Sequence, residues 1–246
     1  MEKMTLHRPR VLIVGAGPVG LALAIELGHR AIPCLLIERN DRVGYAPRAK
    51  TTNVRTREHF RRWGIADTLR KASPLGMDYP SNVVFCTRLS GFELTRFENA
   101  LYCAPGRNPL YSEHSQWVPQ YTVEEVMRAH AQSLPGVEVL VEPAFGERLL
   151  GAWNLRPTDK TRPWLASGLP PPGGETEEDF VARIDGAVRA LWPLLDRRPL
   201  LVGSRGVARA IGVLLNMPGR VDLANGALIE FDLASFENQA TVWDEL

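Results

Sequence analysis

The stretch VLIVGAGPVGLALAIELGHRAIPCLLIE, residues 11–38, determines the fold class of this chain. An apolar run at Val11–Val14 predicts a buried strand, and the glycine-rich turn after it leads into an apolar helix at Pro18–Arg30. A second apolar run at Cys34–Ile37 predicts another strand. Strand, helix and strand in this order are typical of the first βαβ unit of a Rossmann-like α/β fold.

The turn between the first strand and the helix has the spacing G-x-G-x-x-G, with glycines at Gly15, Gly17 and Gly20. The first glycine permits the tight turn, the second lets the backbone approach a pyrophosphate, and the third lets helix and strand pack closely. Pro18 suits the first helical turn, because no backbone hydrogen bond is lost there. The helix N-terminus then presents N–H groups and a positive dipole end to phosphates.

Glu38 follows the second strand, in the position where an acid accepts hydrogen bonds from an adenosine ribose. A carboxylate here favours an unphosphorylated ribose, hence FAD or NAD over NADP. The alternative is a glycine-rich turn followed by a carboxylate that has no binding role. Choosing between FAD and NAD requires residues beyond this fingerprint.

The remainder of the first 144 residues predicts further α/β structure. Alternation with many Pro and Gly residues indicates antiparallel strands and loops across 82–111. A solidly apolar run preceded by a helix predicts another member of a parallel sheet. The expected elements are helices at 53–63, 66–71 and 123–133 and a strand at 137–141.

The pattern changes after residue 144, which divides the chain into expected domains at 1–144 and 145–246. A loop rich in Trp, Pro and Arg precedes an amphipathic helix, for which Thr176 is the expected N-cap. A strand at 200–202, a helix at 207–215 and a strand at 227–231 follow. The apolar positions expected on the buried face of the amphipathic helix are Phe180, Ile184, Val188, Leu191 and Leu195.

Composition narrows the possible partners. The formal net charge of +1 gives no reason to expect a nucleic-acid partner. The three cysteines are far apart and lack metal-ligand spacing, so we expect no metal site and a reducing, cytoplasmic environment. The run 11–25 can be interpreted as a signal peptide, but GAGPVG interrupts it, and it is too short for a membrane span. The oligomeric state is left open.

Three segments resemble the flavoprotein monooxygenases of the p-hydroxybenzoate hydroxylase type, which are FAD-dependent aromatic hydroxylases. They are VLIVGAGPVGLALAIELGHRAIPCLLIER, PRAKTTNVRTREHFRRWGIADTL and WVPQYTVEEVMRAHA. The resemblance implies that Arg39, Arg48 and Gln120 contact FAD. The alternative for both arginines is that they are solvated loop charges, and for Gln120 that it is a helix-start residue. His59 and His130 lie among charges in expected helices, as surface residues do.

The same resemblance implies a flavin-dependent aromatic-ring monooxygenase that uses NAD(P)H as electron donor and a small aromatic substrate. In such enzymes the cofactor carries the redox chemistry, while the protein positions it and excludes water. This sequence lacks the family's later segment ending in Asp-Gly and its GDAAH-type motif, whose residues meet the flavin ring. We therefore expect a truncated protein of doubtful activity, with the adenosine half of the FAD site present.

The C-terminal part resembles the latter half of a histidine phosphatase (phosphoglycerate mutase-like) domain, through GERLLGAWNLRPTDKTRPWLASGLPPPGGETEEDFVARI and PLLVGSRGVARAI. The resemblance places Glu147 at the family's general acid. Arg205 stands where that family has a histidine, and no R-H-G motif is present. Arginine cannot form a phosphohistidine or shuttle a proton.

These features leave three functions open. The first is a flavin-dependent monooxygenase or its remnant. The second is a phosphatase-like enzyme or phosphate-binding module. The third is a non-catalytic nucleotide-binding protein, and use of NAD as an exchanging cosubstrate is a variant that the glycine motif allows. The two parts are either the front of one α/β domain joined to the back of another, or they combine into one composite α/β sheet.

Overall fold

The computed structural model describes residues 11–41, 44, 49–106, 108–191, 200–202 and 204–215. Within these ranges the chain forms two compact units. The sheet unit comprises the described residues of segments 1–15, 32–41 and 138–246, and the helical unit comprises those of segments 16–31 and 42–137. These units cut across the expected boundary at residue 144, because segments from both sides of that boundary contribute to the sheet unit.

The sheet unit is built on a four-stranded sheet of order β7-β2-β1-β8. Its strands are β1 (Val11–Val14), β2 (Cys34–Glu38), β7 (Val137–Val141) and β8 (Leu200–Val202). Strand β1 pairs in parallel with β2, from Val11 opposite Cys34, and with β8, from Val11 opposite Leu200. The pairing of β8 with β1 confirms that the two parts of the chain combine into one composite sheet.

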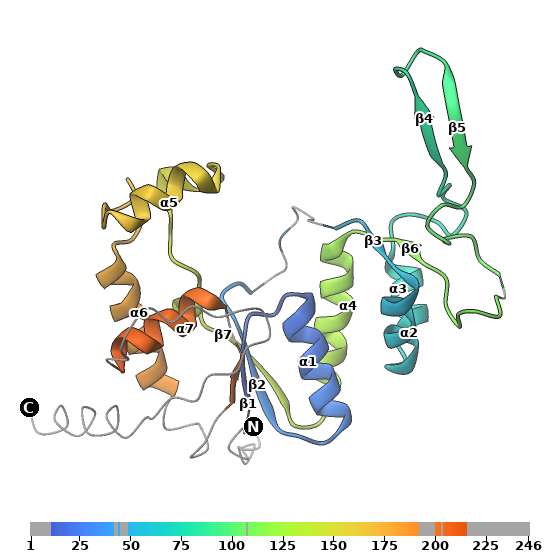
Figure 1. Ribbon diagram of the computed structural model, residues 1–246. Helices are drawn as coiled ribbons and strands as arrows, with labels where there is room; N and C mark the ends of the chain where they lie inside the picture. The colour runs from blue at the N-terminus through green and yellow to red at the C-terminus, as the bar shows by residue number, and fades with distance from the viewer. Residues whose placement is uncertain are drawn as a thin grey trace, which may run out of the picture. The chain divides into compact units, whose positions relative to one another are not determined.

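Two helices cover this sheet, α6 (Glu177–Leu191) and α7 (Arg205–Leu214), and Figure 1 shows them next to the strands. Thr176 begins α6 as expected, because its hydroxyl accepts a hydrogen bond from the Asp179 N–H at 3.0 Å. The shared core contains Leu12, Leu35, Ile37, Phe145, Phe180, Ile184, Ala187, Leu191, Val207, Ala210 and Ile211, with Val188 packed against it. The expected core position Leu195 and the expected strand 227–231 lie outside the described residues.

The long loop expected between residues 143 and 176 contains regular structure instead. It forms two short 3₁₀ helices, η1 (Pro143–Phe145) and η2 (Gly151–Trp153), and a helix α5 (Thr158–Ala166). Pro163 lies inside α5. A helix was not expected there, because proline in a helix interior removes a backbone hydrogen bond and clashes with the preceding turn.

The helical unit contains α1 (Pro18–His29), α2 (Val54–Arg62), α3 (Ala66–Ala72) and α4 (Gln120–Ser133). Helices α1 and α4 pack against each other. A Cβ at Gly28 would lie 2.7 Å from Val137 Cγ2 and 2.9 Å from Leu134 Cδ1, so the absent side chain permits close approach. Helix α4 begins three residues earlier than its apolar pattern predicts, directly after Pro119.

The short strands of the helical unit are β3 (Thr51–Thr52), β4 (Val83–Cys86), β5 (Glu93–Phe97) and β6 (Gln116–Trp117). Strands β4 and β5 form the antiparallel hairpin expected within residues 82–111. All residues of both strands are exposed, and Figure 1 shows the hairpin extending away from α1 and α4. Strands β3 and β6 pair antiparallel and lead directly into α2 and α4.

Candidate functional site

The glycine-rich turn joins β1 to α1. Gly15 has φ +109°, in the region that favours glycine over every L-residue. Gly17 is the N-cap of α1 with φ −73°, which any residue adopts. Apart from the neighbouring residues in the chain, a Cβ at Gly15 or Gly17 would meet no atom of the described residues within 4 Å, so the space beside the turn is open among them. Backbone geometry therefore favours glycine at position 15, whereas the backbone at position 17 does not require it.

The N-terminus of α1 presents backbone donors beside this open space. The first intrahelical hydrogen bond runs from the Leu21 N–H to the Gly17 carbonyl at 3.0 Å. The N–H groups of Val19 and Gly20 therefore precede the first helical bond, and Pro18 occupies the first helical turn as expected. The positive end of the helix dipole favours an anion at this end.

Glu38 lies at the same edge of the sheet as Gly15. The Gly15 N–H donates to the Ile37 carbonyl at 2.7 Å, which fixes the turn against the end of β2. The half-buried Glu38 carboxylate accepts hydrogen bonds from the backbone N–H and the side-chain amide of Asn40, at 3.1 and 3.2 Å. Gly15 and Glu38 thus lie together at the carboxyl ends of parallel strands, where α/β folds bind ligands.

The structure gives less information about the other three residues expected to contact the cofactor, Arg39, Arg48 and Gln120. Arg39 is exposed, and its stem lies along Gly146, where a Cβ would come 3.4 Å from Arg39 Cδ. Arg48 lies outside the described residues. Gln120 is the first residue of α4, and its side-chain amide donates to the Glu124 carboxylate at 2.7 Å. The roles of these residues in cofactor binding stay predictions.

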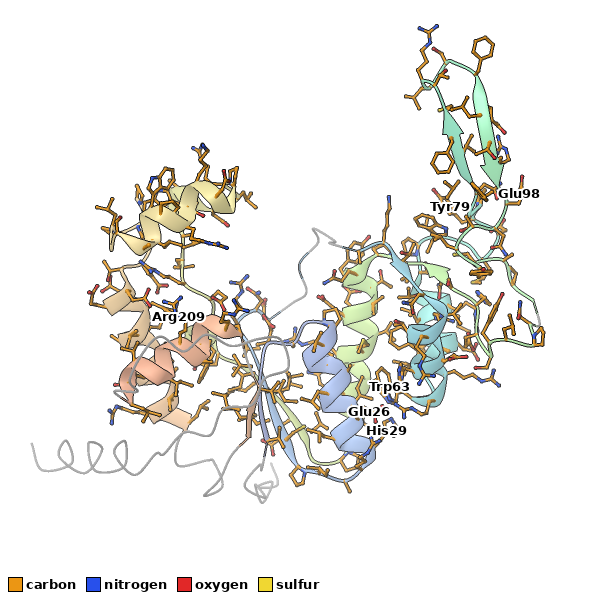
Figure 2. The ribbon with its side chains drawn as sticks, viewed as in Figure 1. Glu26, His29, Trp63, Tyr79, Glu98 and Arg209 are labelled. Carbon is orange, nitrogen blue, oxygen red and sulfur yellow. The ribbon has the colours of Figure 1, made fainter. Side chains whose placement is uncertain are left out.

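A cavity of about 340 Å³ opens within the helical unit. Pro18 and Gln120 both line it, so two of the expected contact residues share one cavity. Its lining also includes Phe60, Trp63, Val123 and Met127, all buried, which make its wall largely apolar. Figure 2 shows Trp63 labelled near Glu26, whose carboxylate accepts a hydrogen bond from the Trp63 indole N–H at 2.8 Å. Sequence reasoning identified Pro18 and Gln120 individually but not the cavity.

A buried ionic cluster was also missed from the sequence. Arg57 is completely buried, and its guanidinium lies 3.3 Å from the Glu113 carboxylate, which also pairs with Arg70 at 2.9 Å. Burial lowers the pKa of Arg57, and the neighbouring Glu113 raises it. The burial of Arg57 could have been predicted from the sequence, because Arg57 lies three residues before Phe60 and so shares the buried face of the helix.

Glu147 lies against Gly206, the residue that follows Arg205 at the start of α7. A Cβ at Gly206 would overlap Glu147 Oε2, so this carboxylate lies against the first turn of the helix. A carboxylate interacts favourably with a helix N-terminus, but there it repels a second anion. The arrangement is therefore poorly suited to holding a phosphate.

Two further groups in the described part of the chain have pKa values shifted by burial, Cys34 and His130. Burial raises the pKa of the Cys34 thiol to about 11, so the thiol stays protonated at neutral pH. Burial and the neighbouring His29 lower the pKa of His130. In the ranges given above, no group of three or more His, Cys, Asp and Glu side chains is arranged to hold a metal ion. No helix in those same ranges is long and apolar enough to span a bilayer.

A family model described as an FAD binding domain matches residues 8–146, which include the turn, Glu38 and Gln120. The chain belongs to this family. The FAD-binding domain is of the aromatic-hydroxylase type, since its relatives include many monooxygenases. The match ends shortly after β7.

The similar proteins include several named monooxygenases. The 6-methylpretetramide 4-monooxygenase of Streptomyces rimosus is 32% identical over 192 residues, covering 75% of this chain and 32% of that protein. The 2,4-dichlorophenol 6-monooxygenase of Delftia acidovorans is 32% identical over 135 residues, covering 53% of this chain and 22% of that protein. This chain therefore spans about a third or less of the length of these relatives.

One solved structure similar to this chain is the rebeccamycin biosynthetic enzyme RebC with reduced flavin. It is 30% identical, with a TM-score of 0.47, over 53% of this chain and 25% of that chain. The histidine phosphatase resemblance of the C-terminal part receives no support from the comparisons. An alignment over 75% of the chain must extend past residue 146, so the Streptomyces rimosus relative also matches residues beyond the family model.

Proposed function

We propose that this chain forms the FAD-binding part of a flavin-dependent aromatic-ring monooxygenase, with Gly15, Gly17, Gly20 and Glu38 holding the adenosine diphosphate half of FAD. The observation that carries the proposal is the open space at Gly15 and Gly17 beside the N-terminus of α1. The 2.7 Å hydrogen bond from Gly15 to Ile37 supports it, because it brings Glu38 to the same edge.

Each part of the chain has a distinct task in this proposal. The backbone N–H groups of Gly17, Val19 and Gly20 donate to the pyrophosphate, and the Glu38 carboxylate accepts hydrogen bonds from the ribose hydroxyls. Further contacts to the cofactor come from residues outside the glycine turn, namely Arg39, Arg48 and Gln120. Bound flavin supplies the redox chemistry, taking electrons from NAD(P)H and activating oxygen for an aromatic substrate. The three free cysteines fit a cytoplasmic protein.

FAD binding is tested with the Gly17→Ala variant. Because a Cβ at this position meets nothing and φ is ordinary, the variant should fold like the parent. Its methyl group occupies the space that a pyrophosphate needs, so we expect FAD affinity to fall at least about tenfold, or roughly 1.4 kcal/mol. Quenching of FAD fluorescence measures the affinity. Gly186→Ala is a matched control, since a Cβ at Gly186 is equally unobstructed.

The absorbance spectrum then separates binding from activity. Flavin bands that bleach on addition of NADPH and an aromatic substrate would support the monooxygenase. Flavin bands that remain unbleached would contradict the proposed monooxygenase activity. They would favour a non-catalytic nucleotide-binding protein. Unchanged FAD affinity in Gly17→Ala would refute the assignment of the site itself. NAD that displaces FAD completely would favour a nicotinamide cosubstrate at the same turn.

A phosphatase is not favoured as a second function. The position of the Glu147 carboxylate against the first turn of α7 opposes phosphate binding there. Arg205 cannot act as a phosphoryl acceptor. We expect no hydrolysis of p-nitrophenyl phosphate.

A further inference from the structure

Two histidines of the helical unit contact each other through their ring nitrogens. His29 Nε2 lies 3.2 Å from His130 Nε2, and the ring centroids are 5.4 Å apart with an interplanar angle of 36°. His29 is the last residue of α1, where Figure 2 labels it, and its side chain is exposed. His130 belongs to the last turn of α4. The pair is therefore accessible to solvent, and it lies at the opposite end of α1 from the glycine turn.

The packing of α1 against α4 sets the distance between the two rings. Gly28, next to His29, has no side chain to separate α1 from Leu134 and Val137. Because the helices approach closely at this point, the two imidazoles meet although they are 101 residues apart in the sequence. The pair is thus fixed by the fold rather than by a flexible loop.

We propose that His29 and His130 form a two-histidine site for a divalent transition-metal ion that prefers imidazole, such as Zn²⁺ or Cu²⁺, with water completing the coordination. Zinc–nitrogen bonds are about 2.0–2.1 Å long, so two ligands at tetrahedral positions lie about 3.3–3.4 Å apart. The separation of 3.2 Å between the Nε2 atoms matches this value closely. Imidazole nitrogen is a preferred ligand of zinc, copper and nickel.

The surrounding charges favour a cation at this point. Both histidines lie at the C-terminal ends of their helices, where the dipole is negative. Arg30 follows His29 in the sequence and pairs with the Glu26 carboxylate, which reduces its repulsion of a metal ion. Without metal, one imidazole donates its Nε2–H to the other. Binding moves that proton to Nδ1 of the same ring, so both Nε2 atoms become ligands with no net proton release.

Thermal unfolding of the tag-free full-length chain in the presence of ZnCl₂ tests this site. We expect Zn²⁺ to raise Tm, because the ion links α1 to α4 only in the folded state. The rise should disappear in His29→Gln and in His130→Gln. His59→Gln is the matched control, because His59 stacks on Trp63 and takes no part in the pair, and it should keep the full rise. An equal rise in both pair variants would overturn the proposal.

Electron paramagnetic resonance of the Cu²⁺-loaded parent gives a second test that needs no variant to fold. Two equatorial nitrogen ligands are expected in the parent, and at most one in either pair variant. One nitrogen or none in the parent would overturn the site. Neither measurement depends on FAD, so the metal site and the proposed cofactor function can fail independently.

Discussion

Arg57 and Glu113 show how a single charged pair can hold a unit together. The Arg57 side chain is completely buried, and its guanidinium also donates to the Ala66 carbonyl at 3.3 Å. Glu113 bridges it to Arg70, so one carboxylate connects α2 and α3 to the segment before β6. Removing one partner of a buried pair costs more than the pair contributes, because the other charge stays buried without compensation.

Glu113→Gln should therefore destabilise the helical unit by about 3–5 kcal/mol, the usual cost of breaking a buried ion pair. Urea unfolding followed by circular dichroism measures the change. Glu93→Gln is the control, because Glu93 pairs with Arg96 on the exposed hairpin and this pair is accessible to solvent. Equal stability of the parent and Glu113→Gln would contradict the structural role of the pair.

The three cysteines differ in reactivity for a physical reason. Cys34 lies in the sheet core with a thiol pKa raised to about 11, Cys103 is buried, and Cys86 is exposed at the end of β4. Since thiolate is the reactive form, we predict one fast-reacting thiol at pH 8 with a disulfide reagent. Cys86→Ser should abolish this fast phase, and denatured protein should react at all three positions. A fast phase that persists in Cys86→Ser would contradict the burial of the other two.

At the scale of elements, α6 illustrates how local and tertiary signals agree. Its N-cap, its acidic first turn and the spacing of its apolar residues all indicate a helix before any contact is known. The structure adds Arg183, whose guanidinium pairs with Glu175 at 2.6 Å and donates to the Gly146 carbonyl at 3.0 Å. This side chain ties α6 to the segment after η1.

Thr176→Ala should destabilise the sheet unit by about 1 kcal/mol, the typical cost of losing an N-cap hydrogen bond. Thr176→Ser retains a hydroxyl that can accept from the Asp179 N–H, so it should restore nearly all of the loss. Urea unfolding of the three proteins provides the comparison. A serine variant as unstable as the alanine variant would show that the methyl group, and not the cap, matters.

At the scale of the whole molecule, β8 and α7 complete a sheet that begins at β1. Residues from the far end of the described chain pair with the strand that leads into the glycine turn. Phe180, Ile184 and Val207 belong to the same core as Leu12 and Ile37. The FAD-binding match at residues 8–146 thus covers only part of the unit that holds Gly15 and Glu38.

A fragment of residues 1–146 should consequently fold poorly on its own. It lacks the helices that bury Leu12, Leu35 and Ile37, and β1 would lose its partner β8. An uncovered apolar sheet face and an open strand edge favour aggregation. We expect rapid proteolysis of the fragment under conditions in which the full chain resists it. A fragment that is as protease-resistant as the full chain would show that α6 and α7 are dispensable.

The sequence by itself determined the βαβ opening, the glycine turn and the cap of α6, because these features depend on neighbouring residues and local periodicity. It also indicated the FAD-binding family through three short segments. Only the tertiary structure decided that β8 joins β1, that Arg57 pairs with Glu113, and that His29 meets His130. Contacts between distant residues depend on how the whole chain packs, and no local pattern in Arg57, Glu113, His29 or His130 specifies their partners. Of the two arrangements that the sequence left open, the structure shows the composite sheet, in which β8 pairs with β1.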